Sequence, residues 1–244
     1  MSLTLLIPIR NRAAHFRVFN SWFPAAAADF PDDLDVIFVE ADGAPNLQAE
    51  IESAGYRSLF VENSGIFHKT RALNRALEES RSTYVVPYDI DLVPYRKTLA
   101  RHYLCARSCA DCVVGGYRLN LPESTLDSNL DQILEAVSID YLAPEDMPTA
   151  LFKQLWHGER FVVLPFFERS RLIDIGGWDE GFQGWGAEDQ DILERYLAER
   201  YFMLRSPEFL YFHLHHGYDA QHWKNDAIVV QNRKAYYAKR KRED

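Results

Sequence analysis

The chain has 244 residues, of which 47% are hydrophobic, and a formal net charge of −9. This is enough apolar sequence for one sizeable α/β domain, and no linker-like composition divides it. The acidic balance argues against a general nucleic-acid binder, because such proteins neutralise phosphates with a positive face. No segment approaches the roughly 20 apolar residues of a membrane span. Met1 leads almost directly into a strand-like run, so we expect a cytoplasmic protein without a signal peptide.

The amino-terminal part alternates predicted strands and helices. Apolar runs with breakers nearby predict strands at 3–9, 34–40, 56–61 and 84–88. Helical patterns lie between them at 13–28, 46–54 and 69–80. This alternation is typical of a mixed, mainly parallel central sheet flanked by helices, which is an α/β fold. We therefore expect residues 1–94 to form the nucleotide-binding half of a single domain.

The pattern after residue 94 is mixed. It predicts strands at 112–119 and 161–166 and helices at 125–141 and 187–200. We expect residues 95–217 to form the half of the domain that binds an acceptor substrate. Residues 218–244 should form a final helix and tail. The basic run at 239–242 indicates a solvated helix end, with a peripheral contact to an acidic membrane surface as the alternative.

Two aspartates follow the predicted strand at 84–88. If the strand ends at Tyr88, Asp89 and Asp91 lie where the chain leaves the sheet, which is where open α/β sheets bind ligands. Two carboxylates there suit Mn²⁺ or Mg²⁺ bridging a diphosphate, because these ions combine a few carboxylates with substrate oxygens. We expect Asp91 to bind the metal and Asp89 to support the metal or the nucleotide. A solvated turn in which both side chains cap backbone amides is the alternative.

The stretch 184–191 reads GWGAEDQD and combines two glycines, a tryptophan and three carboxylates. Such a combination is poor for core packing, because adjacent carboxylates repel and an exposed tryptophan is unfavourable. A loop followed by a helix with an acidic first turn would explain the carboxylates but not the other residues. We expect a functional site here, with Trp185 on a loop that closes over a substrate.

Three histidines, His213, His215 and His216, follow a strand-like run at 208–212. Imidazole is an acceptable ligand of Mn²⁺, so one of them could complete a site begun by Asp91. Strand alternation sends His213 and His215 to one face and His216 to the other. His216 is the first choice and His213 the second, with histidines that bind no metal as the alternative.

Charged residues near the predicted strand ends are candidates for nucleotide contacts. Arg10 and Arg12 follow the first strand, and Arg71 lies near a helix start. Guanidinium groups suit diphosphate or ribose oxygens. Glu40 closes the second strand, where it would hold the uracil or ribose edge or remain a solvated strand end.

Four ordered segments resemble the glycosyltransferases of the GT-A fold, especially the inverting β-1,4-galactosyltransferase and chondroitin-polymerase branch. These segments are 6–12, 67–74, 89–94 and 184–191. The resemblance implies a nucleotide-contacting turn beside Pro8, a helix start beside the nucleotide, a metal motif, and an acceptor and catalytic motif, in that order. It also implies a metal-binding histidine after the catalytic helix.

The same resemblance implies a metal-dependent transferase using Mn²⁺ or Mg²⁺. It would move a hexose, galactose, N-acetylgalactosamine or similar, from a UDP-sugar to a hydroxyl of a glycan, glycolipid or similar acceptor. Asp189 would take the acceptor proton. Glu188 and Asp191 would position the acceptor beside Gly186 and Trp185.

Details of the 184–191 motif bear on mechanism and specificity. Asp189 favours inversion, because the related retaining enzymes typically have Asn after the Glu. Ala187 stands where relatives often have Gly, and Gln190 stands where a further carboxylate can occur. These departures concern donor and acceptor identity more than the class of reaction.

The three cysteines allow another interpretation. Cys105, Cys109 and Cys112 have the spacing of a radical S-adenosylmethionine iron–sulfur motif, although Asp111 stands where those enzymes usually have an aromatic residue. The simpler interpretation is three reduced thiols on one inward face of a helix. A non-catalytic subunit that binds nucleotide-sugar or glycan is a further alternative.

Overall fold

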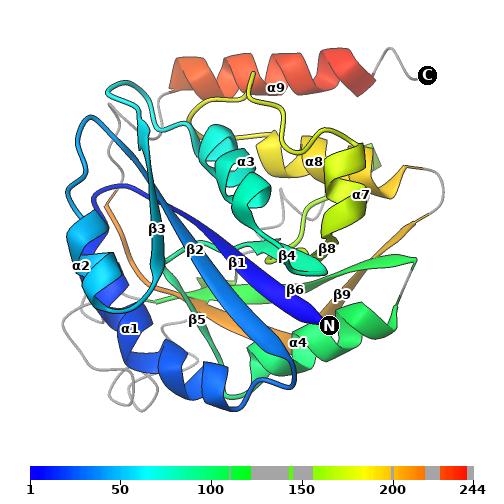
Figure 1. Cartoon of the computed structure of the whole chain (residues 1–244). Coiled ribbons are helices and arrows are strands. Elements are labelled where there is room, and N and C mark those ends of the chain that lie inside the picture. Colours follow the sequence, from blue (N-terminus) through cyan, green and yellow to red (C-terminus); the bar gives the residue numbers. More distant parts are fainter. Residues whose placement is uncertain (110, 122–142, 145–155, 199–200, 218–225, 241–244) are drawn as a thin grey trace.

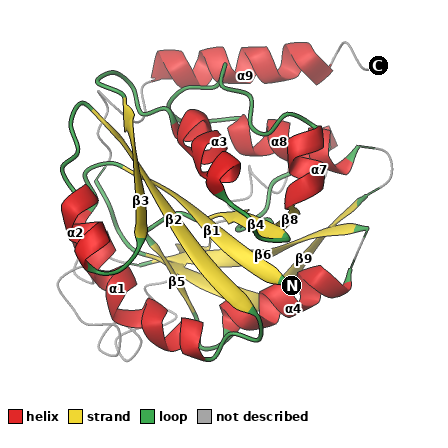
Figure 2. Ribbon diagram, viewed as in Figure 1, coloured by secondary structure: helices red, strands yellow, loops and turns green. Residues whose placement is uncertain are grey.

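The computed structural model describes residues 1–109, 111–121, 143–144, 156–198, 201–217 and 226–240. Its main sheet has the strand order β3-β2-β1-β4-β8, with β1 to β4 parallel and β8 antiparallel to β4 (Figure 2). The strands are β1 (Ser2–Ile9), β2 (Asp33–Asp42), β3 (Arg57–Glu62), β4 (Tyr84–Pro87) and β8 (Phe167–Glu168). The α/β class and the mainly parallel sheet predicted from the sequence are confirmed.

Helices α1 (Ala13–Ala28), α2 (Gln48–Ser53) and α3 (Lys69–Glu79) connect the parallel strands. Alternation along β1 determines which face each helix covers. Leu5 belongs to a buried cluster with Phe19 of α1, whereas Leu6 belongs to a second cluster with Leu73 of α3. Both faces of the sheet are therefore covered, which leaves the carboxyl ends of the strands as the place for a ligand.

A second sheet has the order β5-β9-β6-β7. Its strands are β5 (Leu92–Pro94), β6 (Cys112–Asn120), β7 (Ala143–Pro144) and β9 (Phe202–His213). Its inward residues join the cluster that contains α1, and helix α4 (Thr98–Ser108) also packs there. Gly116 lies where β6 shifts register against β9, and a Cβ there would meet the Phe209 carbonyl oxygen at 2.2 Å. Only glycine allows the two strands this approach.

The described residues of the carboxyl-terminal part also form the helices α7 (Arg169–Asp174), α8 (Glu188–Leu197) and α9 (Asp226–Arg240). Helix α9 runs along the top of the molecule (Figure 1) and contacts α8, where Tyr236 donates a hydrogen bond to Glu194. No helix in the described ranges is both long enough and apolar enough to cross a membrane.

Two sequence predictions are wrong in this region. The strand predicted at 161–166 is only an isolated bridge at Val163, because Leu164 adopts a left-handed φ of 52° that interrupts an extended run. The three cysteines do not share a helix face, because α4 ends at Ser108 and Cys112 begins β6. All three are free and half-buried. The helix predicted at 125–141 lies outside the described residues.

Candidate active site

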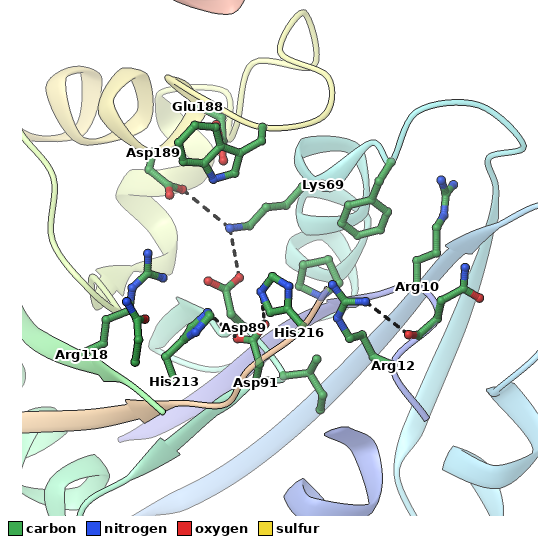
Figure 3. Close-up of a pocket in the computed structure, with 16 residues that line it drawn as sticks. Arg10, Arg12, Lys69, Asp89, Asp91, Arg118, Glu188, Asp189, His213 and His216 are labelled. Carbon is green, nitrogen blue, oxygen red and sulfur yellow. Dashed lines mark hydrogen bonds and ion pairs between the residues drawn. The ribbon is translucent and has the colours of Figure 1, made fainter. Parts of the chain in front are cut away.

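One pocket lies at the carboxyl ends of β1 and β4 and is also lined by residues of α3, α8, β6 and β9 (Figure 3). The sequence segments that line it are far apart in the chain but converge because both sheets end there. The residues predicted from sequence that line it are Pro8, Arg10, Arg12, Asp89, Asp91, Trp185, Glu188, Asp189, His213 and His216. Four predicted residues, Glu40, Arg71, Gly186 and Asp191, do not line it.

Asp91, His213 and His216 offer three ligand atoms within 4.8 Å of one another. The Nε2 atom of His213 lies 3.6 Å from Asp91 Oδ1, and that of His216 lies 3.3 Å from Asp91 Oδ2. The expected separation of these histidines onto opposite faces is wrong, because β9 ends at His213 and the following turn brings His216 back. Pairing of Leu92 with His213 and a 2.8 Å bond from the Leu214 amide to the Asp91 carbonyl fix this arrangement.

The chemistry of this cluster suits a divalent cation. Asp91 Oδ1 is buried and accepts no hydrogen bond from the described residues. A buried carboxylate oxygen that accepts no hydrogen bond is unfavourable unless something positive reaches it. Burial lowers the pKa of His213, which favours the neutral imidazole that a metal requires. His215 plays a different part, since its carbonyl accepts a hydrogen bond from His15 Nε2 at 3.1 Å.

Lys69, the first residue of α3, lies between the two acidic motifs. Its Nζ is 3.0 Å from Asp89 Oδ1 and 4.0 Å from Asp189 Oδ1 (Figure 3). Burial alone would lower the pKa of Lys69, but the neighbouring carboxylates, led by Asp189, outweigh burial and raise it. For Asp89 the two effects have the opposite signs. Burial alone would raise the pKa of Asp89, but the positive charge of Lys69 outweighs burial and lowers that pKa. The ammonium group thus joins residues about a hundred positions apart in the chain.

Sequence reasoning missed Lys69 and chose Arg71, two residues further along the same segment. Arg71 is exposed on α3 and does not line the pocket. Its position could have identified Lys69, because Lys69 is the first residue of the predicted helix and is closer than Arg71 to the turn that precedes it. Arg118 and Asn120 of β6 were also missed, although they line the pocket. Only the pairing of Asn120 with His213 brings them there, and a sequence does not reveal that register.

The two adjacent acids at the start of α8 have different surroundings. Glu188 is 5% exposed, and its Oε2 accepts the Gly186 amide at 2.8 Å. Burial, with a further contribution from the Asp189 charge, raises the pKa of Glu188 to about 7. The Asp189 side chain is 51% exposed and borders the pocket. Of the two, Asp189 is therefore better placed to meet a substrate.

The turn before these acids requires unusual backbone angles. Gly184 and Gly186 have φ values of 67° and 111°, and Ala187, which precedes α8, has a φ of 72°. A left-handed conformation is easy for glycine and strained for alanine. The turn leaves Trp185 39% exposed at the edge of the pocket. The two glycines are therefore needed for backbone geometry.

The two arginines after β1 have different roles. The Arg10 guanidinium is largely buried and donates hydrogen bonds to the carbonyls of Ala41, Asn63 and Gly65. It therefore fastens the ends of β2 and β3 beside the pocket. Arg12 is half-buried and borders the pocket. Arg12 is the better candidate for a direct contact with phosphate oxygens.

Two carboxylates predicted to contact substrate lie outside the pocket and bind other groups of the protein. Glu40 is fully buried, and its oxygens accept the backbone amides of residues 46, 47 and 48 at the start of α2. The Asp191 side chain is 4% exposed and points away from the pocket toward Arg195 Nε at 2.9 Å and Lys239 Nζ at 2.6 Å. Neither group can reach a ligand without breaking these bonds.

Comparisons with known proteins found a family match over part of the chain. A family model described as the N-terminal domain of galactosyltransferase matches residues 157–222, which include the stretch 184–191 and both pocket histidines. Chondroitin sulfate N-acetylgalactosaminyltransferase 1 of Mus musculus is 42% identical over 48 residues, and so is that of Homo sapiens. That match covers 20% of this chain and 9% of each relative.

Solved structures are similar over most of this chain. The mannosyltransferase PcManGT from Pyrobaculum calidifontis, in complex with GDP-Man and Mn²⁺, has a TM-score of 0.57 at 19% identity, covering 86% of this chain and 56% of that one. A structure of S. aureus TarS has a TM-score of 0.60 at 15% identity, covering 88% of this chain and 60% of the other. The chain thus has the GT-A fold of the nucleotide-sugar glycosyltransferases and carries a galactosyltransferase-like segment over residues 157–222.

Proposed function

We propose that this protein is a metal-dependent glycosyltransferase that transfers a hexose from a UDP-sugar to a hydroxyl of a glycan or similar acceptor, with inversion at the anomeric carbon. One observation carries the proposal. A single pocket holds a carboxylate–imidazole cluster suited to Mn²⁺ and also the exposed carboxylate of Asp189 at the start of α8.

Asp91, His213 and His216 would hold the cation. Asp91 Oδ1 accepts no hydrogen bond, and the cluster offers both oxygen and nitrogen donors, which Mn²⁺ accepts. When bound, the ion would supply positive charge that stabilises a leaving diphosphate. The PcManGT structure, solved with a sugar nucleotide and Mn²⁺ on the same fold, supports this combination of ligands.

The remaining pocket residues would bind and orient the substrates. Pro8, Arg12 and Phe67 border the side of the pocket nearest β1, where Arg12 would contact the phosphate oxygens. Lys69 ties Asp89 to Asp189 and thereby holds the proposed base at a fixed place beside the donor. Trp185 would cover the sugar and exclude the water that would otherwise hydrolyse it.

The chemical step is a single displacement. The acceptor oxygen forms a bond to the anomeric carbon while the bond from that carbon to the diphosphate oxygen breaks, so the configuration inverts. The acceptor hydroxyl proton passes to a carboxylate oxygen of Asp189. Glu188, which is more deeply buried and partly protonated near neutrality, would position the acceptor rather than act as the base.

The preference for UDP and for galactose or N-acetylgalactosamine rests on the galactosyltransferase-like segment and on the named relatives. Arg12 and the metal cluster would bind any nucleoside diphosphate, so a donor screen has to include GDP-mannose as well as UDP-linked hexoses.

The test is a screen of UDP-linked hexoses and GDP-mannose, with Mn²⁺ or chelator, for nucleotide release with and without oligosaccharide acceptors. We expect acceptor-dependent UDP release that disappears with chelator, and NMR of the product should show the inverted anomeric configuration. Binding of UDP without any turnover would instead favour a non-catalytic subunit. Retention of configuration would contradict the assignment of Asp189 as the base.

A further inference from the structure

The loop that carries Trp185 is held from two sides. On one side, the segment around the start of α3 contacts it: the Gly184 amide donates to the Phe67 carbonyl at 2.9 Å, and Thr70 Oγ1 donates to the Phe182 carbonyl at 3.0 Å. These bonds connect the loop to the part of the chain that also carries Lys69. The other side of the loop faces α9 (Figure 1).

Asn232 makes the contacts from α9. Its side-chain amide nitrogen donates to the Gln183 carbonyl at 2.8 Å and to the Trp185 carbonyl at 3.3 Å. Asn232 is 4% exposed, so water competes poorly for these two carbonyls. A single amide group thus fixes the backbone on both sides of Gly184.

Apolar contacts from α9 hold the next turn of the loop. Tyr236 forms a small buried cluster with Phe182 and Ala187, and Ala187 is the residue with the strained left-handed backbone. Strained angles persist where surrounding contacts leave no alternative. The packing by α9 therefore stabilises the conformation that starts α8 at Glu188.

Several other contacts fasten α9 itself. Lys239 makes ion pairs with Asp179 and Asp191, and Tyr236 donates to a carboxylate oxygen of Glu194. None of these depends on Asn232. Removing the Asn232 amide should therefore loosen the loop while α9 stays in place.

We propose that Asn232 is a positioning residue: through the Gln183 and Trp185 carbonyls it holds the 183–187 loop so that Trp185 and Asp189 face the pocket together. The expected effect of Asn232 on catalysis rests on the proposed function. The Asn232 side chain itself does not line the pocket. Its effect should appear in turnover and in loop opening rather than in nucleotide affinity.

The test compares Asn232→Asp, which keeps the size of the side chain but replaces the amide donor with a carboxylate oxygen, with Gln231→Ala, an exposed neighbour on the same helix. Amide hydrogen exchange of residues 183–187 should rise about 10-fold in Asn232→Asp, because the Gly184 and Gly186 amides lose protection as the loop opens. Exchange over α9 should change little, and Gln231→Ala should resemble wild type.

In the Mn²⁺-dependent assay, kcat of Asn232→Asp should fall roughly 10-fold or more, because misplacement of a catalytic group slows the chemical step. UDP affinity should stay within about two-fold. Unchanged exchange of the loop, unchanged kcat, or an equal rise of exchange along α9 would overturn the proposal. If Asn232→Asp does not fold, Asn232→Ala decides by the same readouts. Amide hydrogen exchange of the loop does not require turnover. This readout therefore tests the role of Asn232 even if no glycosyltransferase activity is found.

Discussion

Replacing Glu188 by Gln should stabilise the fold in alkaline solution. Burial, followed by the Asp189 charge, raises the pKa of Glu188 from 4.5 to about 7. The folded protein therefore holds this proton more tightly than the unfolded chain, and stability is lost as the pH rises from 4.5 to 7. At about 1.4 kcal/mol for each pKa unit, ionised Glu188 destabilises the fold by up to about 3 kcal/mol. Gln cannot ionise but still offers an oxygen to the Gly186 amide.

The assay is denaturant unfolding of metal-free protein over this range of pH. We expect Glu188→Gln to match wild type near pH 4.5 and to exceed its unfolding free energy by up to about 3 kcal/mol near pH 8. Glu62→Gln, at an exposed end of β3, serves as control and should show no such trend. An equal effect at every pH would refute the reasoning, because the gain would not come from ionisation. Acceptor KM should rise in Glu188→Gln more than kcat falls.

Three further changes probe the base, the core and the strained turn. Asp189→Asn should lower kcat by roughly 10² or more while UDP-sugar affinity stays within a few-fold; near wild-type turnover would exclude Asp189 as base. Burial lowers the pKa of His102 to about 3, so wild type should lose about 1.4 kcal/mol per pH unit as the pH falls from 6.5 toward 3. His102→Gln should flatten this loss in denaturant titrations, unlike a change at exposed His157. Ala187→Gly should change the unfolding free energy by less than about 1 kcal/mol, because relief of the strained φ of 72° offsets the loss of a buried methyl group; a larger loss of stability would contradict this.

The local parts of the fold were predictable because they depend on nearby residues. Helix α1 spans the predicted range 13–28, and β4 ends just before Asp89 as the breakers indicated. The carboxyl ends of parallel strands lie at one edge of the sheet. The order of elements therefore also predicted that Arg12 and Asp89, which follow two such strands, would line the same pocket.

The candidate residues that lie outside the pocket do so for a common physical reason, which is that packing determines the partner of a charged side chain. Glu40 lies at a strand end like Asp89, but the amides at the start of α2 bind it. Asp191 lies in the same motif as Asp189, but it is two residues further along α8 and so about 200° around the helix axis, where it meets Lys239 of α9. Lys69 was missed for the converse reason, since its two partners come from other elements.

The predicted positions of the histidines depend on where the preceding strand ends. Continued alternation would have separated His213 from His216, whereas the end of β9 at His213 lets the turn unite them at Asp91. The end of β9 is determined by its pairing with β5, which the local sequence does not predict.

Calorimetric titration of UDP into the protein, with Mn²⁺ and then with chelator, tests the central claim most directly. We expect binding that requires the ion, disappears in Asp91→Ala, and persists in Asp189→Asn, because only Asp91 belongs to the cluster with His213 and His216. UDP binding that is equally strong with chelator, or unaffected by Asp91→Ala, would contradict a metal-bound diphosphate at this site.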